Sequence, residues 1–217
     1  MDQTLTEIYN RLLARYGRQH WWPAETDFEV ILGAVLTQNT AWKNVEKVLA
    51  ELRRCGLLSW EALSRLRIEE LAPYLRSSGY FNQKARRLRA FFDYLETRYA
   101  GSLAKMALQE TEVLRQELLA LKGFGPETVD TILLYAFGRP IFVVDAYTRR
   151  VLIRHRLCPE TISYDELQCR IQTAIPTQAS YYNEFHALIV VVGKEYCRSQ
   201  PRCSGCPLEP MFALRIK

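Results

Sequence analysis

The sequence has little histidine, little cysteine and no long apolar segment. Only three of its 217 residues are histidine and six are cysteine, and three of the cysteines are isolated along the chain, so a disulfide framework is excluded. The densest apolar run, ALIVVVG at 187–193, is too short to cross a bilayer. The polar start MDQTLTEIYNRLL also lacks the basic and apolar parts of a signal peptide. We therefore expect a soluble cytoplasmic protein with no membrane partner.

The excess of positive charge is modest. Lys and Arg together number 29 and Asp and Glu 24, which gives a net charge of +5. Such a balance fits a polyanionic partner without requiring one. The length suffices for one domain or two small ones.

The apolar residues follow the helical period almost throughout, and strand-like alternation is nearly absent. Gly and Pro break this pattern into roughly ten short helices. The fold class predicted is therefore all-α. Two segments show the period most clearly: Leu5, Ile8, Tyr9, Leu12, Leu13 and Tyr16; and Leu88, Phe91, Phe92, Leu95 and Tyr99.

A Gly-rich turn opens a helix in LKGFGPETVDTILLYAF, residues 121–137. Gly123 and Gly125 flank one apolar residue, and Pro126 suits the first helical position because its missing N–H has no partner there. Backbone N–H groups beside glycines can approach an anion closely, so a DNA phosphate is a natural ligand. The alternative is a tight turn between two helices in which the glycines serve geometry alone.

Asp145 ends the apolar stretch IFVVD and precedes another helix. Aspartate is among the commonest N-cap residues, so one reading of Asp145 is purely structural. The Gly-rich turn about 20 residues upstream favours a second reading, in which the carboxylate is catalytic.

This pairing of hairpin and aspartate resembles the helix-hairpin-helix DNA glycosylases of the endonuclease III superfamily. The resemblance implies that Gly123 and Gly125 grip the phosphate backbone and that Asp145 faces a flipped nucleotide. LGAVLTQNT at 32–40 and SGYFNQKARRL at 78–88 are similar to the family's two duplex-probing loops. It follows from the resemblance that Gln38 and Asn39 fill the gap left by the extruded base, with Tyr80 or Phe81 as a wedge; the alternative is an ordinary loop and a buried aromatic ring.

Glu127 departs from the pattern of the bifunctional members, which carry a lysine in the helix after the hairpin. That lysine forms a Schiff base with the sugar, and a carboxylate cannot do so. We therefore expect no strand-nicking lyase activity unless another lysine supplies the amine. Glu127 also suits the first turn of its helix, where a negative charge complements the dipole.

A narrower resemblance, to the 3-methyladenine DNA glycosylase III branch, is carried by five segments: WWP at 21–23, LGAVLTQNT, SGYFNQKA, the hairpin followed by VD, and FHxxIVxxxK at 185–194. In that branch the matching lysine can be carbamylated, so Lys194 is a candidate for this modification. The residues that would form or border the base pocket are Trp21, Trp22, Pro23, Trp42, Glu127 and Lys194.

An aromatic pocket suits an alkylated purine. N3-alkylation leaves the base positively charged, and a cation over an indole face gains about 0.5–2 kcal/mol. The charge also makes the purine a good leaving group, so the enzyme needs chiefly to stabilise positive charge on the sugar. We expect a monofunctional glycosylase for alkylated purines such as 3-methyladenine. The alternatives are an endonuclease III-like glycosylase for oxidised pyrimidines and a non-catalytic DNA-binding iron–sulfur protein.

Three cysteines near the C-terminus, Cys197, Cys203 and Cys206, resemble the loop by which many endonuclease III relatives hold a [4Fe–4S] cluster. The family's fourth cysteine would fall at Phe212, and the first spacing is one residue short. The options are a cluster with a non-cysteine ligand, a remote ligand such as Cys158 or Cys169, a zinc site, or a decayed loop. His186, in FHALIVVV, is instead expected to be a hydrogen-bonded core residue.

The resemblance also implies the architecture. We expect two helical domains with a DNA-binding cleft between them and a monomer that binds double-stranded DNA containing damaged bases. Residues 23–135 would form a six-helix barrel with the helix-hairpin-helix at about 113–135. Residues 1–22 and 136–217 would form the second domain, with the catalytic Asp and the cysteine loop.

Overall fold

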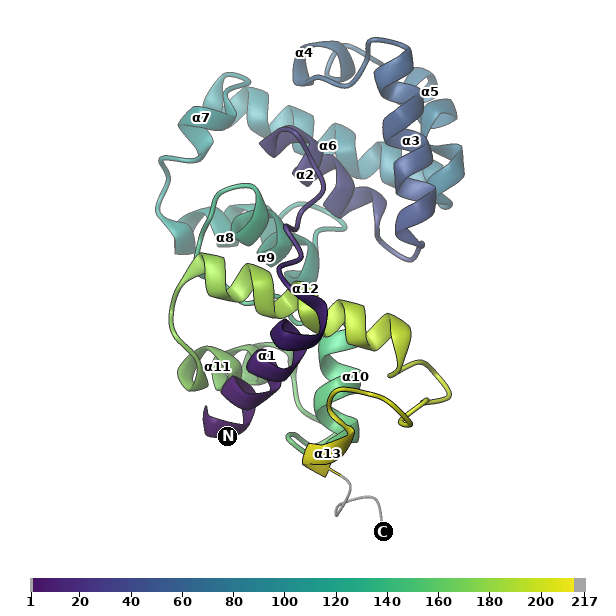
Figure 1. The fold of residues 1–217 in the computed structure, drawn as a ribbon. Helices are drawn as coiled ribbons and strands as arrows, with labels where there is room; N and C mark the ends of the chain where they lie inside the picture. The colour runs from purple at the N-terminus through teal and green to yellow at the C-terminus, as the bar shows by residue number, and fades with distance from the viewer. Residues whose placement is uncertain (1, 213–217) are drawn as a thin grey trace. The chain divides into compact units, whose positions relative to one another are not determined.

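A computed structural model describes residues 2–212, and over this range the chain forms helices and no strand. The prediction of an all-α protein is confirmed. The chain divides into two compact units (Figure 1). Unit 1 comprises Met1–Trp21 and Gly138–Lys217, and unit 2 comprises Trp22–Phe137.

Unit 2 is built around α2 (Asp27–Leu36), which after its acidic first turn is apolar on every side. A helix of this kind must be surrounded by others. Accordingly, every residue from Phe28 to Leu36 is buried, and α2 packs against α3, α6 and α9. The helix begins at Thr26, whose side chain accepts the Glu29 N–H. The other elements of unit 2 are α3 (Trp42–Arg54), α4 (Trp60–Leu63), α5 (Ile68–Leu71), the 3₁₀ helix η1 (Ala72–Ser78), α6 (Phe81–Tyr99), α7 (Leu103–Met106), α8 (Thr111–Leu119) and α9 (Pro126–Tyr135).

The helix-hairpin-helix of unit 2 consists of α8, α9 and the Gly-rich turn between them. A bidentate ion pair clamps the two helices together: Arg115 Nε lies 2.7 Å from Asp130 Oδ1, and Arg115 Nη2 lies 3.2 Å from Oδ2. Asp130 is completely buried, so removing the arginine would leave an uncompensated charge in the core. The clamp therefore fixes the geometry of the hairpin.

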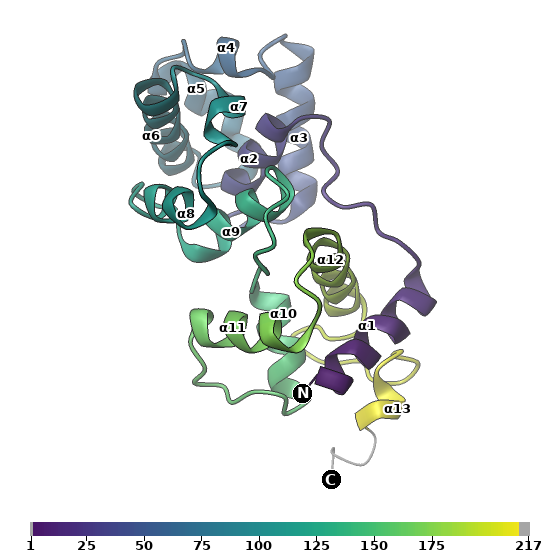
Figure 2. The same cartoon turned by 90° about the vertical axis from the view of Figure 1, so that its left-hand side faces the viewer.

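Unit 1 is built in the same way around α12 (Ala179–Glu195), which carries the apolar run of the C-terminal half. This helix packs against α10 (Ala146–Arg154) and α1 (Asp2–Tyr16), and α1 lies beside it in both ribbon views (Figures 1 and 2). The remaining helices of unit 1 are α11 (Tyr164–Ala174) and α13 (Glu209–Phe212).

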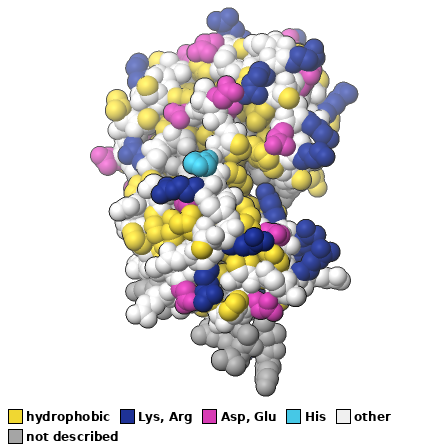
Figure 3. Space-filling view, in the orientation of Figure 1, with side chains coloured by type: hydrophobic (Ala, Val, Ile, Leu, Met, Phe, Trp, Pro, Cys, Tyr) yellow, Lys and Arg dark blue, Asp and Glu magenta, His cyan; other side chains and the backbone are white. Residues whose placement is uncertain are grey.

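Charged side chains are mixed over the surface shown in Figure 3, where Lys and Arg lie among acidic residues. On this face, charge alone therefore does not identify a DNA-binding region. The residues that contact DNA have to be inferred from the geometry of particular side chains.

Candidate functional site

Asp145 is the N-cap of α10: its Oδ1 accepts the Thr148 N–H at 2.7 Å. The predicted cap is therefore present. The extended segment before it is buried, and side chains of α11 satisfy its backbone groups. Gln172 accepts the Phe142 N–H at 2.8 Å, and Gln168 donates to the Phe142 carbonyl at 2.7 Å. These bonds fix the backbone of the segment that directly precedes Asp145.

The Asp145 carboxylate is buried beside His186. Asp145 is 8% exposed and His186 4%, and Asp145 Oδ2 lies 3.6 Å from His186 Nε2. Burial alone raises the pKa of the Asp145 carboxyl, but the nearby His186 imidazole, together with the bonds from Thr148, outweighs burial and leaves the pKa below its usual value. The carboxylate is therefore ionised at neutral pH, as stabilisation of a cation requires.

Trp21, Lys194 and Tyr147 lie around the same part of unit 1. The Trp21 ring centroid is 6.0 Å from that of His186. Lys194 Nζ lies 5.5 Å from the Trp21 ring centroid and 6.0 Å from that of Tyr147. Tyr147 packs onto α12 at Gly193, where an added Cβ would lie 2.6 Å from Tyr147 Cδ1. Unit 1 thus gathers a carboxylate, an imidazole, an ammonium group and two aromatic faces.

Trp22 belongs to a different aromatic group, in unit 2. Its ring meets that of Trp42 edge to face at 5.2 Å between centroids and that of Tyr135 at 5.3 Å. It also covers α2 at Gly33, where an added Cβ would lie 3.1 Å from Trp22 Nε1. Pro23, which follows, is exposed. Each of the paired tryptophans therefore packs within its own unit.

The Gly-rich turn has one position that requires glycine. Gly123 has φ of +90°, and an added Cβ would meet the Arg87 side chain, with Cδ at 2.8 Å. Gly125 has φ of −86° and open space around it. As predicted, α9 begins at Pro126, and Glu127 lies exposed in its first turn. An exposed helix N-terminus with a bare glycine beside it is able to receive a phosphate.

Gln38 ties the first of the two loops predicted to probe the duplex to the hairpin. Its Nε2 donates to the Gly123 carbonyl at 3.0 Å and to Thr128 Oγ1 at 2.8 Å, and its Oε1 accepts from Arg87. Asn39, the next residue, is exposed with φ of +54°. The side chain more accessible to DNA in this loop is therefore that of Asn39.

The second probing loop presents Tyr80, which is 64% exposed and has φ of +45°. A non-glycine residue in this left-handed region is strained, and such strain is concentrated at functional positions. Phe81 is half-buried as the first residue of α6, with Arg76 over its ring at 5.9 Å. Of the two predicted wedge residues, Tyr80 is the one that protrudes.

Lys84, which the sequence analysis does not single out, joins the two probing loops. It is completely buried, and its Nζ donates to the Leu36 carbonyl at 2.8 Å and the Ser78 carbonyl at 2.6 Å. These carbonyls lie at the ends of α2 and η1, directly before the two loops. Burial, with the charge of Arg87 acting in the same direction, lowers the pKa of Lys84 to about 8.

The three C-terminal cysteines line one cavity of about 220 Å³, together with His155 and Glu209. Three thiols fall short of the usual four-thiolate set of a [4Fe–4S] cluster. Over residues 2–212, no three His, Cys, Asp or Glu side chains are arranged to hold a metal ion. The donors as placed do not fit the four-cysteine cluster.

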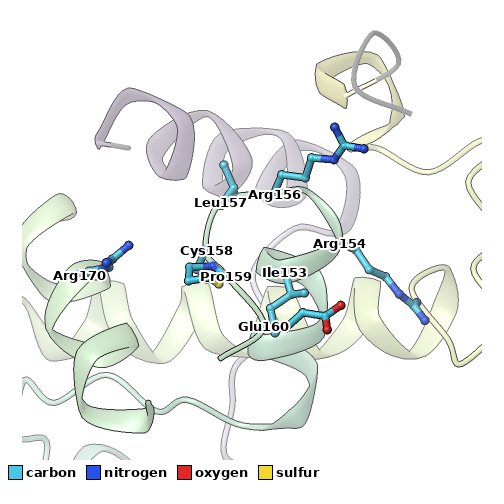
Figure 4. Close-up of a pocket in the computed structure, with 8 residues that line it drawn as sticks. All are labelled: Ile153, Arg154, Arg156, Leu157, Cys158, Pro159, Glu160 and Arg170. Carbon is cyan, nitrogen blue, oxygen red and sulfur yellow. The ribbon is translucent and has the colours of Figure 1, made fainter. Parts of the chain in front are cut away.

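A second, more open hollow in unit 1, of about 670 Å³, is lined by Arg154, Arg156, Cys158 and Arg170 (Figure 4). Two of these arginines are engaged: Arg154 donates to the Ser199 carbonyl at 2.7 Å, and Arg170 pairs with Glu166 at 2.6 Å. None of the predicted base-pocket residues lines this hollow.

Arg149 and Arg150 of α10 donate hydrogen bonds to backbone carbonyls elsewhere in unit 1. Arg149 donates to the Ile162 carbonyl at 2.8 Å, and Arg150 donates to the carbonyls of Gly193 and Cys197. Their guanidinium groups satisfy loop carbonyls. Arg149 and Arg150 are therefore engaged in holding the backbone of unit 1.

Comparisons with known proteins identify the family of the chain. Residues 32–177 match the HhH-GPD superfamily of base excision DNA repair proteins. A protein of Methanocaldococcus jannaschii, provisionally named a DNA repair glycosylase, is 41% identical over 95% of this chain and 94% of its own. Endonuclease III of Thermotoga maritima is 27% identical over 94% of this chain and 90% of its own.

A solved structure extends the likeness to three dimensions. The Helicobacter pylori 3-methyladenine DNA glycosylase bound to 1,N6-ethenoadenine superposes with a TM-score of 0.77 and 30% identity, covering 89% of this chain and 96% of that one. No helix among residues 2–212 is long and apolar enough to span a bilayer. The chain belongs to the HhH-GPD superfamily of base excision DNA repair proteins.

Proposed function

We propose that this protein is a monofunctional DNA glycosylase that flips out alkylated purines, such as 3-methyladenine, and hydrolyses their N-glycosidic bond. The observation that carries the proposal is the buried, ionised Asp145 in the same unit as two neighbouring aromatic faces, those of Trp21 and Tyr147. A positively charged purine needs an aromatic face of this kind. The likeness to a 3-methyladenine DNA glycosylase supports the same substrate class.

In the proposed reaction the alkylated purine leaves with the bonding electrons and so becomes neutral. Positive charge then develops at C1′ of the sugar, and the Asp145 carboxylate stabilises it and orients the attacking water. As the water oxygen bonds to C1′, the carboxylate accepts the proton that the water loses. Because the carboxylate is buried, its interaction with that charge is little screened by solvent. The hairpin glycines and the two probing loops would hold the distorted duplex during this step.

Strand nicking is not part of the proposal. A lyase of this superfamily uses an amine in the helix after the hairpin, and Glu127 occupies that place. The predicted cluster contributes no step either, since the cysteine set does not fit four-thiolate binding.

The test is base release by Asp145→Asn on methylated duplex DNA. Asparagine is nearly isosteric and also caps helices, so folding should be preserved. We expect the rate to fall by roughly 10²–10⁴-fold with duplex affinity unchanged. Asp165→Asn, which alters an exposed aspartate in the first turn of α11, is the matched control and should release bases normally.

The substrate class is tested on a panel of 3-methyladenine, 7-methylguanine, hypoxanthine and thymine glycol. Release of the alkylated purines without borohydride trapping is the expected result. Release of thymine glycol with a trapped covalent adduct would instead favour the endonuclease III-like alternative. A wild-type rate for Asp145→Asn would show that this carboxylate is only a helix cap.

A further inference from the structure

The two carboxylate oxygens of Asp145 have different neighbours. Oδ1 accepts the capping N–H of Thr148 at 2.7 Å. Oδ2 lies 3.6 Å from His186 Nε2, on a different helix. Because capping occupies Oδ1, Oδ2 is the oxygen that remains to face a substrate, and its position depends on His186.

The His186 ring is itself held in place. It projects from the buried stretch of α12 and is only 4% exposed. The Trp21 centroid lies 6.0 Å away with the rings tilted by 49°, and the Phe142 ring meets His186 edge to face at 6.2 Å. An imidazole packed between two aromatic rings cannot turn away without disturbing the core. The imidazole therefore keeps a fixed orientation relative to the Asp145 carboxylate beside it.

We propose that His186 is a positioning residue that holds Oδ2 of Asp145, through Nε2, in the orientation needed to stabilise the charge at C1′. This inference rests on the proposed function of Asp145. The lowered pKa of the carboxyl, to which His186 contributes, agrees with it. A misplacement of about 1 Å at a reacting group can cost on the order of 10²-fold in rate, so an effect on catalysis is expected although His186 touches no substrate.

Two polar substitutions separate positioning from packing. In His186→Gln the amide nitrogen can reach the place of Nε2, whereas in His186→Asn it reaches only the place of Nδ1. We expect the single-turnover rate of base release from methylated duplex DNA to fall roughly 10- to 100-fold in His186→Asn. The rate in His186→Gln should stay within about 5-fold of wild type, and duplex affinity should be unchanged in both.

Tyr182→Phe provides the control on the same helix. Tyr182 is completely buried, and its hydroxyl lies 3.5 Å from the Gln172 carbonyl rather than near Asp145. Removing that hydroxyl should lower stability slightly and leave the single-turnover rate unchanged. Loss of rate in this variant would mean that any defect in α12 slows the reaction.

A double-mutant cycle decides whether His186 acts through Asp145. If it does, His186→Asn lowers the small residual rate of Asp145→Asn no further. If the rate losses of the two single variants multiply in the double variant, the inference is overturned. Equal rates in His186→Asn and His186→Gln would overturn it as well. A wild-type rate for Asp145→Asn would be a failure of the proposed function itself, so the two failures are distinguishable.

Discussion

Asp145 in unit 1 and Tyr80 in unit 2 are both predicted to act on DNA, yet they are 8% and 64% exposed. In unit 1 the reactive candidate is buried, caps α10 and is faced by the His186 imidazole. In unit 2 the candidates for DNA contact lie on turns with positive φ, at Asn39, Tyr80 and Gly123. A carboxylate that stabilises a cation benefits from exclusion of water, whereas groups that grip a duplex must protrude. If this division is real, changes in unit 1 should affect rate and changes in unit 2 should affect binding.

The largest effect is expected at Lys84, which supports the exposed turns of unit 2 from within the core. Its pKa is about 8 in the folded protein and 10.5 in the unfolded chain. Between these values the unfolded chain binds more protons, so the free energy of unfolding rises with pH. Relative to Lys84→Met, the wild type should gain about 3 kcal/mol between about pH 8 and about pH 10.5, as measured by urea unfolding.

The same variant bears on the comparison of the units. Lys84→Met releases the carbonyls that precede both probing loops, so duplex affinity should fall while the single-turnover rate at saturating protein stays near wild type. A reduced rate at saturation, or a stability difference that does not change with pH, would contradict this account of Lys84.

The adjacent tryptophans offer a second test, because they pack in different units. Trp22→Ala removes a ring packed on Trp42, Tyr135 and α2, and should lower the free energy of unfolding by about 2 kcal/mol. Trp21→Ala should cost less than half of that and should instead slow base release, since its ring lies beside His186 and under Lys194. Thermal unfolding and single-turnover rates measure the two effects. Equal stability losses with unchanged release in Trp21→Ala would remove Trp21 from the proposed base pocket.

The local features of the sequence predicted local structure well. The cap at Asp145, the helix start at Pro126 and the helical class all follow from residues close together in the chain, whose preferences act within one or two turns. Lys84 shows where such reasoning stops. Lys84 lies four residues before Leu88 on the apolar stripe of α6, and this position indicates that its side chain is buried. The carbonyl that it binds, that of Leu36, is 48 residues away in the chain and cannot be identified from local sequence.

The site is predicted less completely, for a similar reason. His186 was expected to be a core histidine, and it is one, but its neighbour Asp145 is remote in sequence and only the packing of α10 on α12 brings them together. The resemblance grouped Trp21 with Trp22, but the two residues pack in different units. They lie in the non-helical segment at 17–24, where no helical pattern in the sequence indicates the direction of each side chain. Tertiary packing, rather than local preference, decides these contacts.

The smallest effect is expected at Gly125, and it separates the two readings of the hairpin. Gly125→Ala introduces a Cβ that meets no atom within 4 Å, at a φ of −86° that alanine adopts readily, so stability should change by less than about 0.5 kcal/mol. If the turn receives a phosphate, the added methyl group hinders that approach and duplex affinity should fall about 10-fold, or about 1.4 kcal/mol. Gly123→Ala is the comparison: its φ of +90° and the nearby Arg87 predict losses of both stability and affinity. Unchanged duplex binding by Gly125→Ala, measured by fluorescence anisotropy, would mean that the glycines shape the turn and that unit 2 grips DNA elsewhere.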